Sequence, residues 1–93
     1  MKYEWYFSDN IKGIVNSYSA AVEELNKHLD FDITNFSEYK TQYVMCNEMP
    51  CGLGCETAYF YPGTMPDEEI RQDNGTHTPR IRGVCEKHYD YLK

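Results

Sequence analysis

The sequence lacks any long run of apolar residues, and its first residues do not resemble a secretory signal. Residues 1–10 (MKYEWYFSDN) contain one lysine and no apolar stretch. No segment approaches the apolar length that a membrane-spanning helix needs. We therefore expect a cytoplasmic protein whose cysteines stay reduced.

Positive charge is also scarce. The chain has 9 lysines and arginines against 15 aspartates and glutamates, and its formal net charge is −6. Nucleic acids and anionic lipids repel a chain with this balance, so broad electrostatic binding to either is disfavoured. A basic surface on a partner is a better match.

The chain is short, and 93 residues can bury only a small core. Domains of this size often add a metal ion or disulfides, and the four cysteines suit either device. A reducing cytoplasm favours the metal. Aromatic residues are abundant by contrast, with nine tyrosines, four phenylalanines and one tryptophan. Such side chains serve equally in a core or at a protein interface.

One amphipathic helix is predicted over residues 8–29, where apolar residues recur three and four positions apart. The apolar positions are Ile11, Ile14, Val15, Tyr18, Val22, Leu25 and Leu29. Ser8 or Asp9 is suited to cap its first turn, and Gly13 would weaken the second turn by roughly 1 kcal/mol relative to alanine. Residues 2–7 (KYEWYF) are expected to form a short strand or an aromatic flap over this helix.

The second half of the chain favours β-structure. Residues 41–46 (TQYVMC) and 56–61 (ETAYFY) are rich in β-branched and aromatic residues, which predicts two strands. Residues 62–78 are rich in turn formers and predict an exposed loop, with one helical turn at 67–72 (DEEIRQ). A helix that begins at Cys85 is expected to end the chain.

The expected fold class is therefore α+β. We predict a single small domain over 1–93, in which an N-terminal amphipathic helix packs on a small zinc-binding β-hairpin and a C-terminal helix. Residues 1–40 form the helical subregion and residues 41–93 the zinc-binding one. Ile33 and Phe36 are among the apolar residues expected to pin the junction to the core.

Thiols and an imidazole occur in the second half at spacings typical of a zinc site. The candidate ligands are Cys46, Cys51, Cys55, Cys85 and His88. Zinc prefers four such ligands in a tetrahedron, which two tight turns can supply in pairs. Pro50 and Gly52 flank Cys51 and let the chain fold back, so that backbone amides stabilise a thiolate. Cys85 and His88 are three apart at the start of the expected helix and so share one face.

These residues resemble the short treble-clef-like zinc fingers of bacteriophage and bacterial proteins, in which Cys-x4-Cys precedes an Arg-Gly-Leu-Cys-x2-His-Tyr block. The match consists of Cys46 and Cys51, followed by residues 82–89 (RGVCEKHY), and it covers only the second half of the chain. The ligands that the resemblance implies are Cys46, Cys51, Cys85 and His88. Cys55 is an extra thiol beyond the family pattern, and it competes with Cys51 for the fourth position.

Other interpretations of the same residues are weaker. Cysteines that are buried as thiols, or paired in any of three disulfide connectivities, would leave His88 unexplained. Redox catalysis is disfavoured because the chain has no Cys-x2-Cys motif. His28 is expected to stabilise the carboxyl end of the amphipathic helix, and His77 to lie solvated in a loop. The acidic residues of 67–73 lack the spacing of a calcium loop.

A closed zinc site points away from catalysis. Four protein ligands leave no open coordination position, so we predict that the protein is not an enzyme and that zinc serves folding. The leading hypothesis is a phage-encoded adaptor or inhibitor in the host cytoplasm, which binds a host or viral protein through aromatic side chains. Two alternatives stay open, a nucleic-acid-binding regulator that uses residues 80–93 and an acidic mimic of DNA. No membrane or small-molecule partner is expected.

Overall fold

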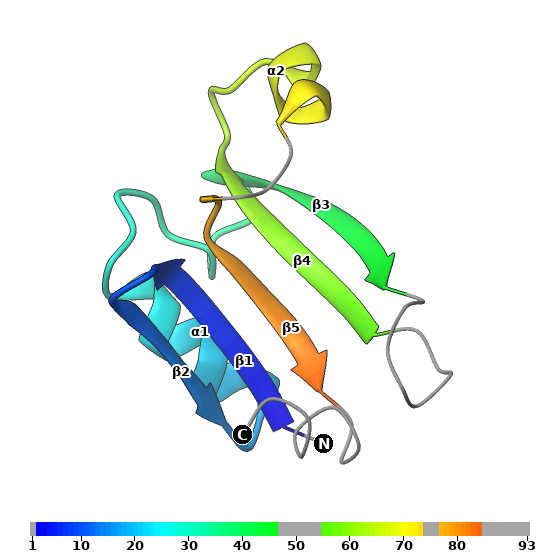
Figure 1. The fold of residues 1–93 in the computed structure, drawn as a ribbon. Coiled ribbons are helices and arrows are strands. Elements are labelled where there is room, and N and C mark those ends of the chain that lie inside the picture. The colour runs from blue at the N-terminus through cyan, green and yellow to red at the C-terminus, as the bar shows by residue number, and fades with distance from the viewer. Residues whose placement is uncertain (1, 47–54, 74–76, 85–93) are drawn as a thin grey trace.

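The computed structural model describes residues 2–46, 55–73 and 77–84, and it shows a five-stranded antiparallel sheet with two short helices. The elements are β1 (Lys2–Ser8), β2 (Ile11–Val15), α1 (Tyr18–Asn26), β3 (Tyr39–Cys46), β4 (Cys55–Pro62), α2 (Asp67–Gln72) and β5 (Arg80–Val84). The strand order is β2-β1-β5-β4-β3, so β5 joins the β1–β2 hairpin to the β3–β4 hairpin (Figure 1). No helix among the described residues is long and apolar enough to cross a membrane.

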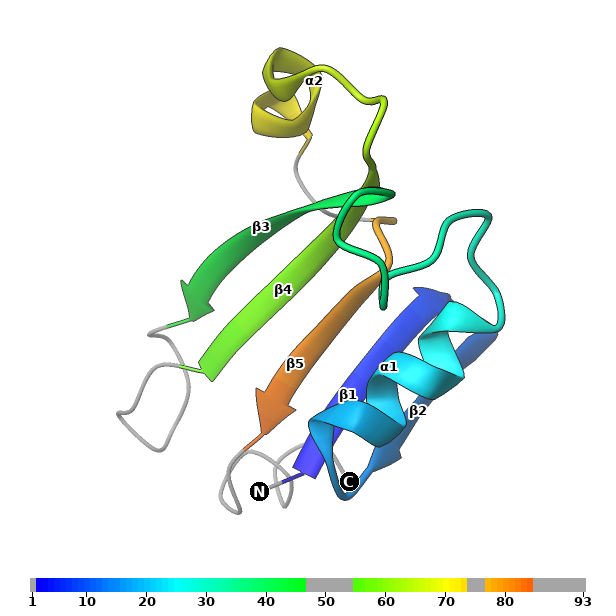
Figure 2. The ribbon, with the colours of Figure 1, turned by 180° about the vertical axis from the view of Figure 1, so that it is seen from behind.

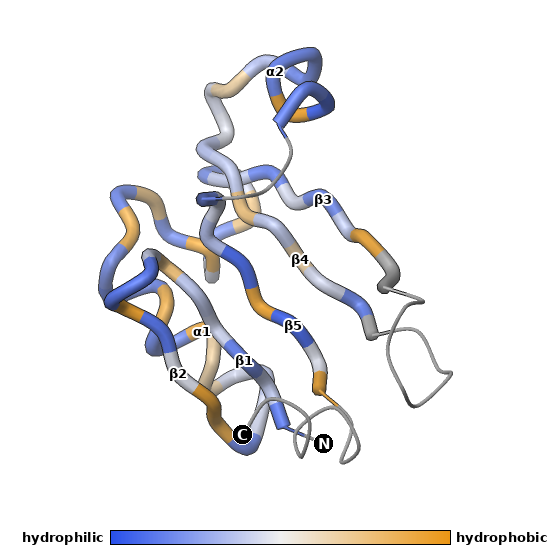
Figure 3. Tube along the Cα trace, in the orientation of Figure 1, coloured by the Kyte–Doolittle hydropathy of each residue, from blue (hydrophilic) through white to orange (hydrophobic). Residues whose placement is uncertain are grey.

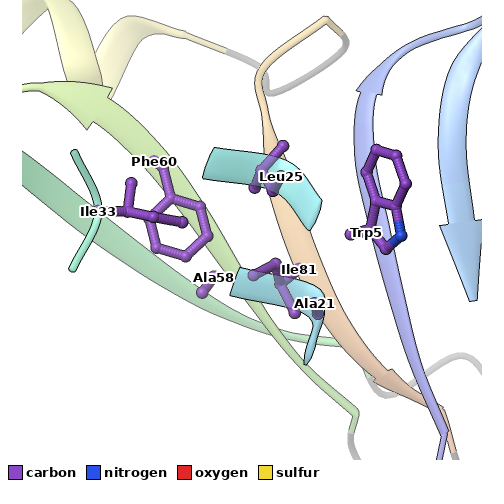
Figure 4. Packing of buried hydrophobic residues seen from close by; sticks show 7 residues of the cluster. All are labelled: Trp5, Ala21, Leu25, Ile33, Ala58, Phe60 and Ile81. Atoms are coloured by element: carbon purple, nitrogen blue, oxygen red, sulfur yellow. The ribbon is translucent and has the colours of Figure 1, made fainter. Parts of the chain in front are cut away.

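The core lies between α1 and one face of the sheet. The helix contacts β1, β2 and β5, and Figure 2 shows it crossing that face beside β1 and β2. Ala21 and Leu25 of α1 are 0% exposed. Figure 4 shows the packing of the core, whose buried members are Trp5, Ala21, Leu25, Ile33, Ala58, Phe60 and Ile81. Burial of a leucine side chain contributes roughly 1.5–3 kcal/mol, so Leu25 is one of the residues that hold α1 on the sheet.

Side chains alternate between the two faces along the central strands. Trp5, Ile81 and Ala58 are register partners across β1, β5 and β4, and they form one row of the core. Arg80 and Arg82 alternate with Ile81, so they face away from α1. Figure 3 shows the resulting alternation of hydrophilic and hydrophobic residues along β5.

The N-terminal amphipathic helix predicted over residues 8–29 is wrong, and with it the treble-clef-like fold class. A hairpin of β1 and β2 occupies residues 2–15, and only Tyr18–Asn26 is helical. Ile11 and Val15 are four apart, an even spacing that also places two residues on one face of a strand. Asp9 and Asn10 form the turn between the strands, and both residue types favour turns. The N-terminal stretch KYEWYF is therefore a strand.

Gly13 allows β2 to pack closely against Trp5 of β1. It is the register partner of Trp5 across the hairpin. A Cβ atom placed on Gly13 would lie 2.8 Å from Nε1 of Trp5, closer than such atoms approach one another. The missing side chain thus makes room for the indole ring beside the core.

Ser17, rather than Ser8 or Asp9, caps the helix. The Ser17 hydroxyl accepts a hydrogen bond from the Ala20 amide at 3.2 Å, as an N-cap residue does. At the other end of α1, the side chain of its last residue, Asn26, accepts a hydrogen bond from the Ile33 amide at 2.9 Å and donates one to Asp32 at 3.0 Å. These bonds hold the following loop, where Ile33 is 4% exposed and joins the core as expected. Phe36, also expected there, is 86% exposed.

The second half of the chain follows the predictions more closely. The strands expected at 41–46 and 56–61 are present as β3 and β4, and the helical turn expected at 67–72 is α2. β5 has no counterpart among the predicted elements, because two arginines and a glycine conceal the alternation within five residues. The helix predicted from Cys85 lies outside the described residues.

Candidate functional site

Two of the candidate metal ligands lie at one end of the sheet. Cys46 is the last residue of β3 and Cys55 is the first residue of β4. The two are direct partners in the antiparallel register. The pairing of β3 with β4 thus places the two cysteine positions opposite each other at this end of the sheet.

β5 leads toward the same end. Thr57 lies opposite Arg82, and two further residues along each strand lead to Cys55 on β4 and to Val84 on β5. β5 therefore ends, at Val84, at the sheet end that carries the β3–β4 cysteine pair.

The remaining candidate ligands, Cys51, Cys85 and His88, lie outside the described residues. Within 2–46, 55–73 and 77–84, no group of three or more histidines, cysteines, aspartates or glutamates is placed to hold a metal ion.

The other two histidines lie away from the cysteine end. The His28 ring stacks on Trp5, with centroids 5.7 Å apart and planes 12° apart, and its centroid lies 5.5 Å from that of Phe7. The His28 amide donates to the Leu25 carbonyl at 3.0 Å, just past the end of α1. His77 is exposed in the segment before β5. His28 therefore covers one side of the buried tryptophan.

Aromatic side chains gather where α1 leaves the sheet uncovered, next to the edge strand β3. We call Tyr18, Phe36, Tyr39 and Tyr43 the β3 aromatic surface. Phe36, Tyr43 and Tyr18 are 86%, 61% and 42% exposed. The Phe36 ring lies 5.9 Å from that of Tyr39, which in turn lies 5.8 Å from that of the buried Phe60. The surface is therefore attached to the core through Tyr39.

Electrostatic effects link the members of this surface. Burial, with smaller contributions from the nearby Tyr43, Tyr39 and Glu56, raises the pKa of Tyr18 from 10.0 to about 12. Burial also raises the pKa of Tyr39, and Tyr43 adds to that shift. These hydroxyls stay protonated at neutral pH, so each can donate a hydrogen bond to a partner.

Cations gather on the opposite face of the sheet, although the chain is acidic overall. The strand residues that face away from α1 include Lys2, Lys12, Lys40, Arg80 and Arg82, together with Glu4. Arg82 forms a salt bridge with Glu4, with 3.1 Å between the guanidinium nitrogen and the carboxylate oxygen. The Arg80 guanidinium lies 3.9 Å above the centre of the Tyr6 ring, in a cation–π contact. We call this set the cationic face.

α2 packs beside the first half of β3. Nζ of Lys40 donates to the Met65 carbonyl at 2.9 Å and to the Asp67 carboxylate at 3.2 Å. An open pocket between the two elements is lined by Lys40, Thr41, Gln42, Asp67, Ile70 and Arg71. Asp67, Glu68 and Glu69, which fall in the helical turn expected within the exposed loop, form the first turn of α2, where carboxylates favour the positive end of the helix, and Asp73 follows its last turn.

Sequence reasoning expected Phe36 in the core, and it did not single out Tyr43. Both were part of an aromatic content that fits a core and an interface equally well. Tyr43 is exposed because β3 is at the sheet edge and α1 packs on β1, β2 and β5, which leaves the β3 end of the same face uncovered. Phe36 lies in the loop before β3. The order of strands in space cannot be read from one sequence.

Comparison with known proteins gives no relative from which function can be transferred. No family model, curated protein or solved structure matches the chain. The likeness of the cysteine and histidine pattern to treble-clef-like zinc fingers thus stays a resemblance in motif.

Proposed function

We propose that this chain is a small protein-binding module stabilised by zinc, and that it binds its partner through the β3 aromatic surface. The observation that carries the proposal is the exposure of Phe36 and Tyr43, at 86% and 61%. Exposed clusters of large apolar side chains are typical of interaction sites, and aromatic residues are enriched at interfaces. Tyr39 contacts both Phe36 and Phe60, and these contacts already restrict the rings. Binding would therefore cost less side-chain entropy.

Zinc would add folding free energy to a small core. The register supports Cys46 and Cys55 as one pair of ligands, because directly opposed strand positions suit two thiolates on one ion. Cys85 and His88 would complete a tetrahedral site, with Cys51 as the alternative that the family pattern favours. Such a closed site serves structure, so we infer that the protein is not an enzyme and takes no small-molecule substrate.

A reducing compartment keeps cysteines as thiols that can bind zinc, which favours a cytoplasmic location for the proposed module. The motif resemblance suggests a phage-encoded protein that acts in the host cytoplasm as an adaptor or inhibitor. The acidic net charge of −6 favours a partner with a basic surface.

Chemical cross-linking in the native cell, followed by affinity capture and mass spectrometry, tests the protein-binding proposal. The double variant Phe36→Ala/Tyr43→Ala is compared with the wild-type chain and with Ile14→Ala. Ile14 is 43% exposed on the opposite edge strand and is a matched apolar control. We expect the double variant to lose partners that the wild type and the control retain. Equal capture by all three chains would contradict the proposal.

Binding of nucleic acid is a second candidate, and the cationic face favours it. Arg80 and Arg82 both lie on that face, and basic side chains contact the backbone of single strands. The Tyr6 ring under Arg80 is 6% exposed and so offers no surface for base stacking. Pairing of Arg82 with Glu4 reduces the charge available. Binding to a single-stranded oligonucleotide that weakens steeply with salt, and that Arg80→Ala and Arg82→Ala abolish, would support this candidate. Absence of binding at low salt would remove it.

Acidic mimicry of DNA is the remaining alternative. The exposed carboxylates of the first turn of α2, Asp67, Glu68 and Glu69, are the densest acidic group on the described chain. Competition between this protein and DNA for a captured partner would distinguish mimicry from binding through the aromatic surface.

A further inference from the structure

The two edges of the sheet differ in their protection against pairing with another chain. β2 has five residues, it carries an exposed lysine at position 12, and its register with β1 shifts between Tyr6 and Ser8. A short strand, a charged side chain and a bulge are all devices that make an edge a poor template for pairing. β2 is therefore a blunted edge.

β3 lacks this protection along its second half. It has eight residues, and its register with β4 is continuous from Tyr39 to Cys46. Tyr43 and Val44 are 61% and 45% exposed. The one charged residue of the strand, Lys40, is held at the α2 end by the Met65 carbonyl and Asp67. A long, exposed and apolar edge of this kind is a template for strand addition.

β3 lies at the edge of the sheet, and this position determines which of its backbone groups a partner can reach. Among the described strands β3 pairs with β4 alone, so its other side presents backbone donors and acceptors. Alternate side chains of a strand added there would lie on the two faces of the sheet. On the α1 face they would meet the β3 aromatic surface at Tyr43, and on the cationic face they would meet Val44.

We propose that β3 accepts an extended segment of a protein partner as an additional strand, a mode of binding that rests on the proposed protein-binding function. Main-chain hydrogen bonds supply affinity in this mode, and contacts with alternate side chains supply specificity. β-branched and aromatic residues at the centre of the segment match Tyr43 and Val44, because such pairs stabilise neighbouring strands.

Charged residues near β3 indicate which residues should flank the added segment. Glu38 immediately precedes β3, and the exposed Glu56 lies opposite Met45 on β4, so carboxylates occur on both sides of Tyr43 and Val44. A segment flanked by lysine or arginine is attracted to these groups. A second copy of this chain brings a further charge of −6 and is repelled. The occupant is therefore an apolar segment with basic flanks from another protein.

Amide hydrogen exchange on the full chain, with synthetic peptides as the probe, tests strand addition. The first peptide alternates valine and threonine between lysine flanks. A second peptide has glutamate flanks, and a third is N-methylated on alternate amides so that it cannot pair. We expect the lysine-flanked peptide to slow exchange along β3, and the other two to bind at least about tenfold more weakly.

Two matched variants locate the site. Val44→Lys places a charge on β3, whereas Ile14→Lys places one at a β-branched position of nearly equal exposure, 43% against 45%, on the other edge strand. Val44→Lys should weaken the lysine-flanked peptide about tenfold or more, and Ile14→Lys should have little effect. Circular dichroism on both variants checks that each chain keeps its fold.

Three results would overturn strand addition. These are no binding of the lysine-flanked peptide, binding that leaves exchange along β3 unchanged, and slowed exchange along β3 that depends on protein concentration without peptide. The last result would identify a second copy as the occupant. If partner capture still depends on Phe36 and Tyr43 in any of these cases, the protein-binding function stands and only the strand-addition mode is lost.

Discussion

Replacement of Gly13 by alanine distinguishes the two accounts of residues 8–29 by the sign of the stability change. In the amphipathic helix that the apolar spacing predicts, glycine to alanine would stabilise the protein by roughly 1 kcal/mol. In the structure, a Cβ atom at position 13 would lie 2.8 Å from Nε1 and 3.1 Å from Cε2 of Trp5. The indole ring is in the buried core cluster and must shift. Overpacking of this kind typically costs about 1–3 kcal/mol.

Urea unfolding followed by far-UV circular dichroism measures this change. We expect a lower unfolding midpoint for Gly13→Ala at an unchanged slope. A Trp5→Phe background provides the control, since phenylalanine lacks the indole nitrogen that the new methyl group would meet. Gly13→Ala should cost less there, with a coupling free energy of about 1 kcal/mol between the two positions. An unchanged or raised midpoint for Gly13→Ala would refute the packing of Trp5 on Gly13.

Three further predictions concern α1. Leu25→Ala should lower the free energy of unfolding by about 2–5 kcal/mol in the same urea assay, because Leu25 is 0% exposed in the core; a loss under 1 kcal/mol would contradict that burial. Ser17→Ala should cost about 1 kcal/mol through loss of the N-cap bond, and Ser17→Asp should restore most of it. Tyr18 has its pKa raised from 10.0 to about 12, so it stabilises the fold below pH 10 and this contribution is lost between about pH 10 and pH 12. The shift corresponds to roughly 2.7 kcal/mol, which solvent screening of a 42% exposed side chain reduces to about 1 kcal/mol. Tyr18→Phe should lose stability less steeply over that pH range, and parallel pH profiles would count against the shift.

The sequence predicted local β-structure in the second half well. β3 and β4 combine β-branched and aromatic residues with flanking turn formers, and tertiary packing agrees with that local preference. The same reasoning identified the DEEIRQ turn that forms α2. In each case the deciding information lies within a few residues of the element.

The structure of the N-terminal half was predicted wrongly because its apolar pattern is compatible with two structures. Ile11, Val15 and Leu25 fit both a helical face and the alternation of a strand followed by a shorter helix. What decides is the pairing of Trp5 with Gly13 and of β1 with β5, which are contacts between residues distant in sequence. Such contacts also place the exposed aromatic residues and the cationic face, so neither surface was predictable from the sequence.

The metal ligands were predicted more specifically than the fold was. Spacing alone left Cys51 and Cys55 in competition beside Cys46. The β3–β4 register adds a physical reason to prefer Cys55, because it is the direct partner of Cys46. Replacement of each thiol by serine ranks the two, since a ligand lost from a closed site weakens zinc binding far more than a bystander does.

Native mass spectrometry of the full chain, purified from intact cells under reducing conditions, shows whether the fold depends on a bound zinc ion. We expect one zinc ion per chain, lost from Cys46→Ser and from Cys85→Ser, and we expect the chain to unfold when a chelator removes the metal, because β5 shares one sheet and one core with the N-terminal half. A chain that carries no zinc and keeps its fold in chelator, or one whose mass shows cysteines joined as disulfides in the cell, would contradict this expectation.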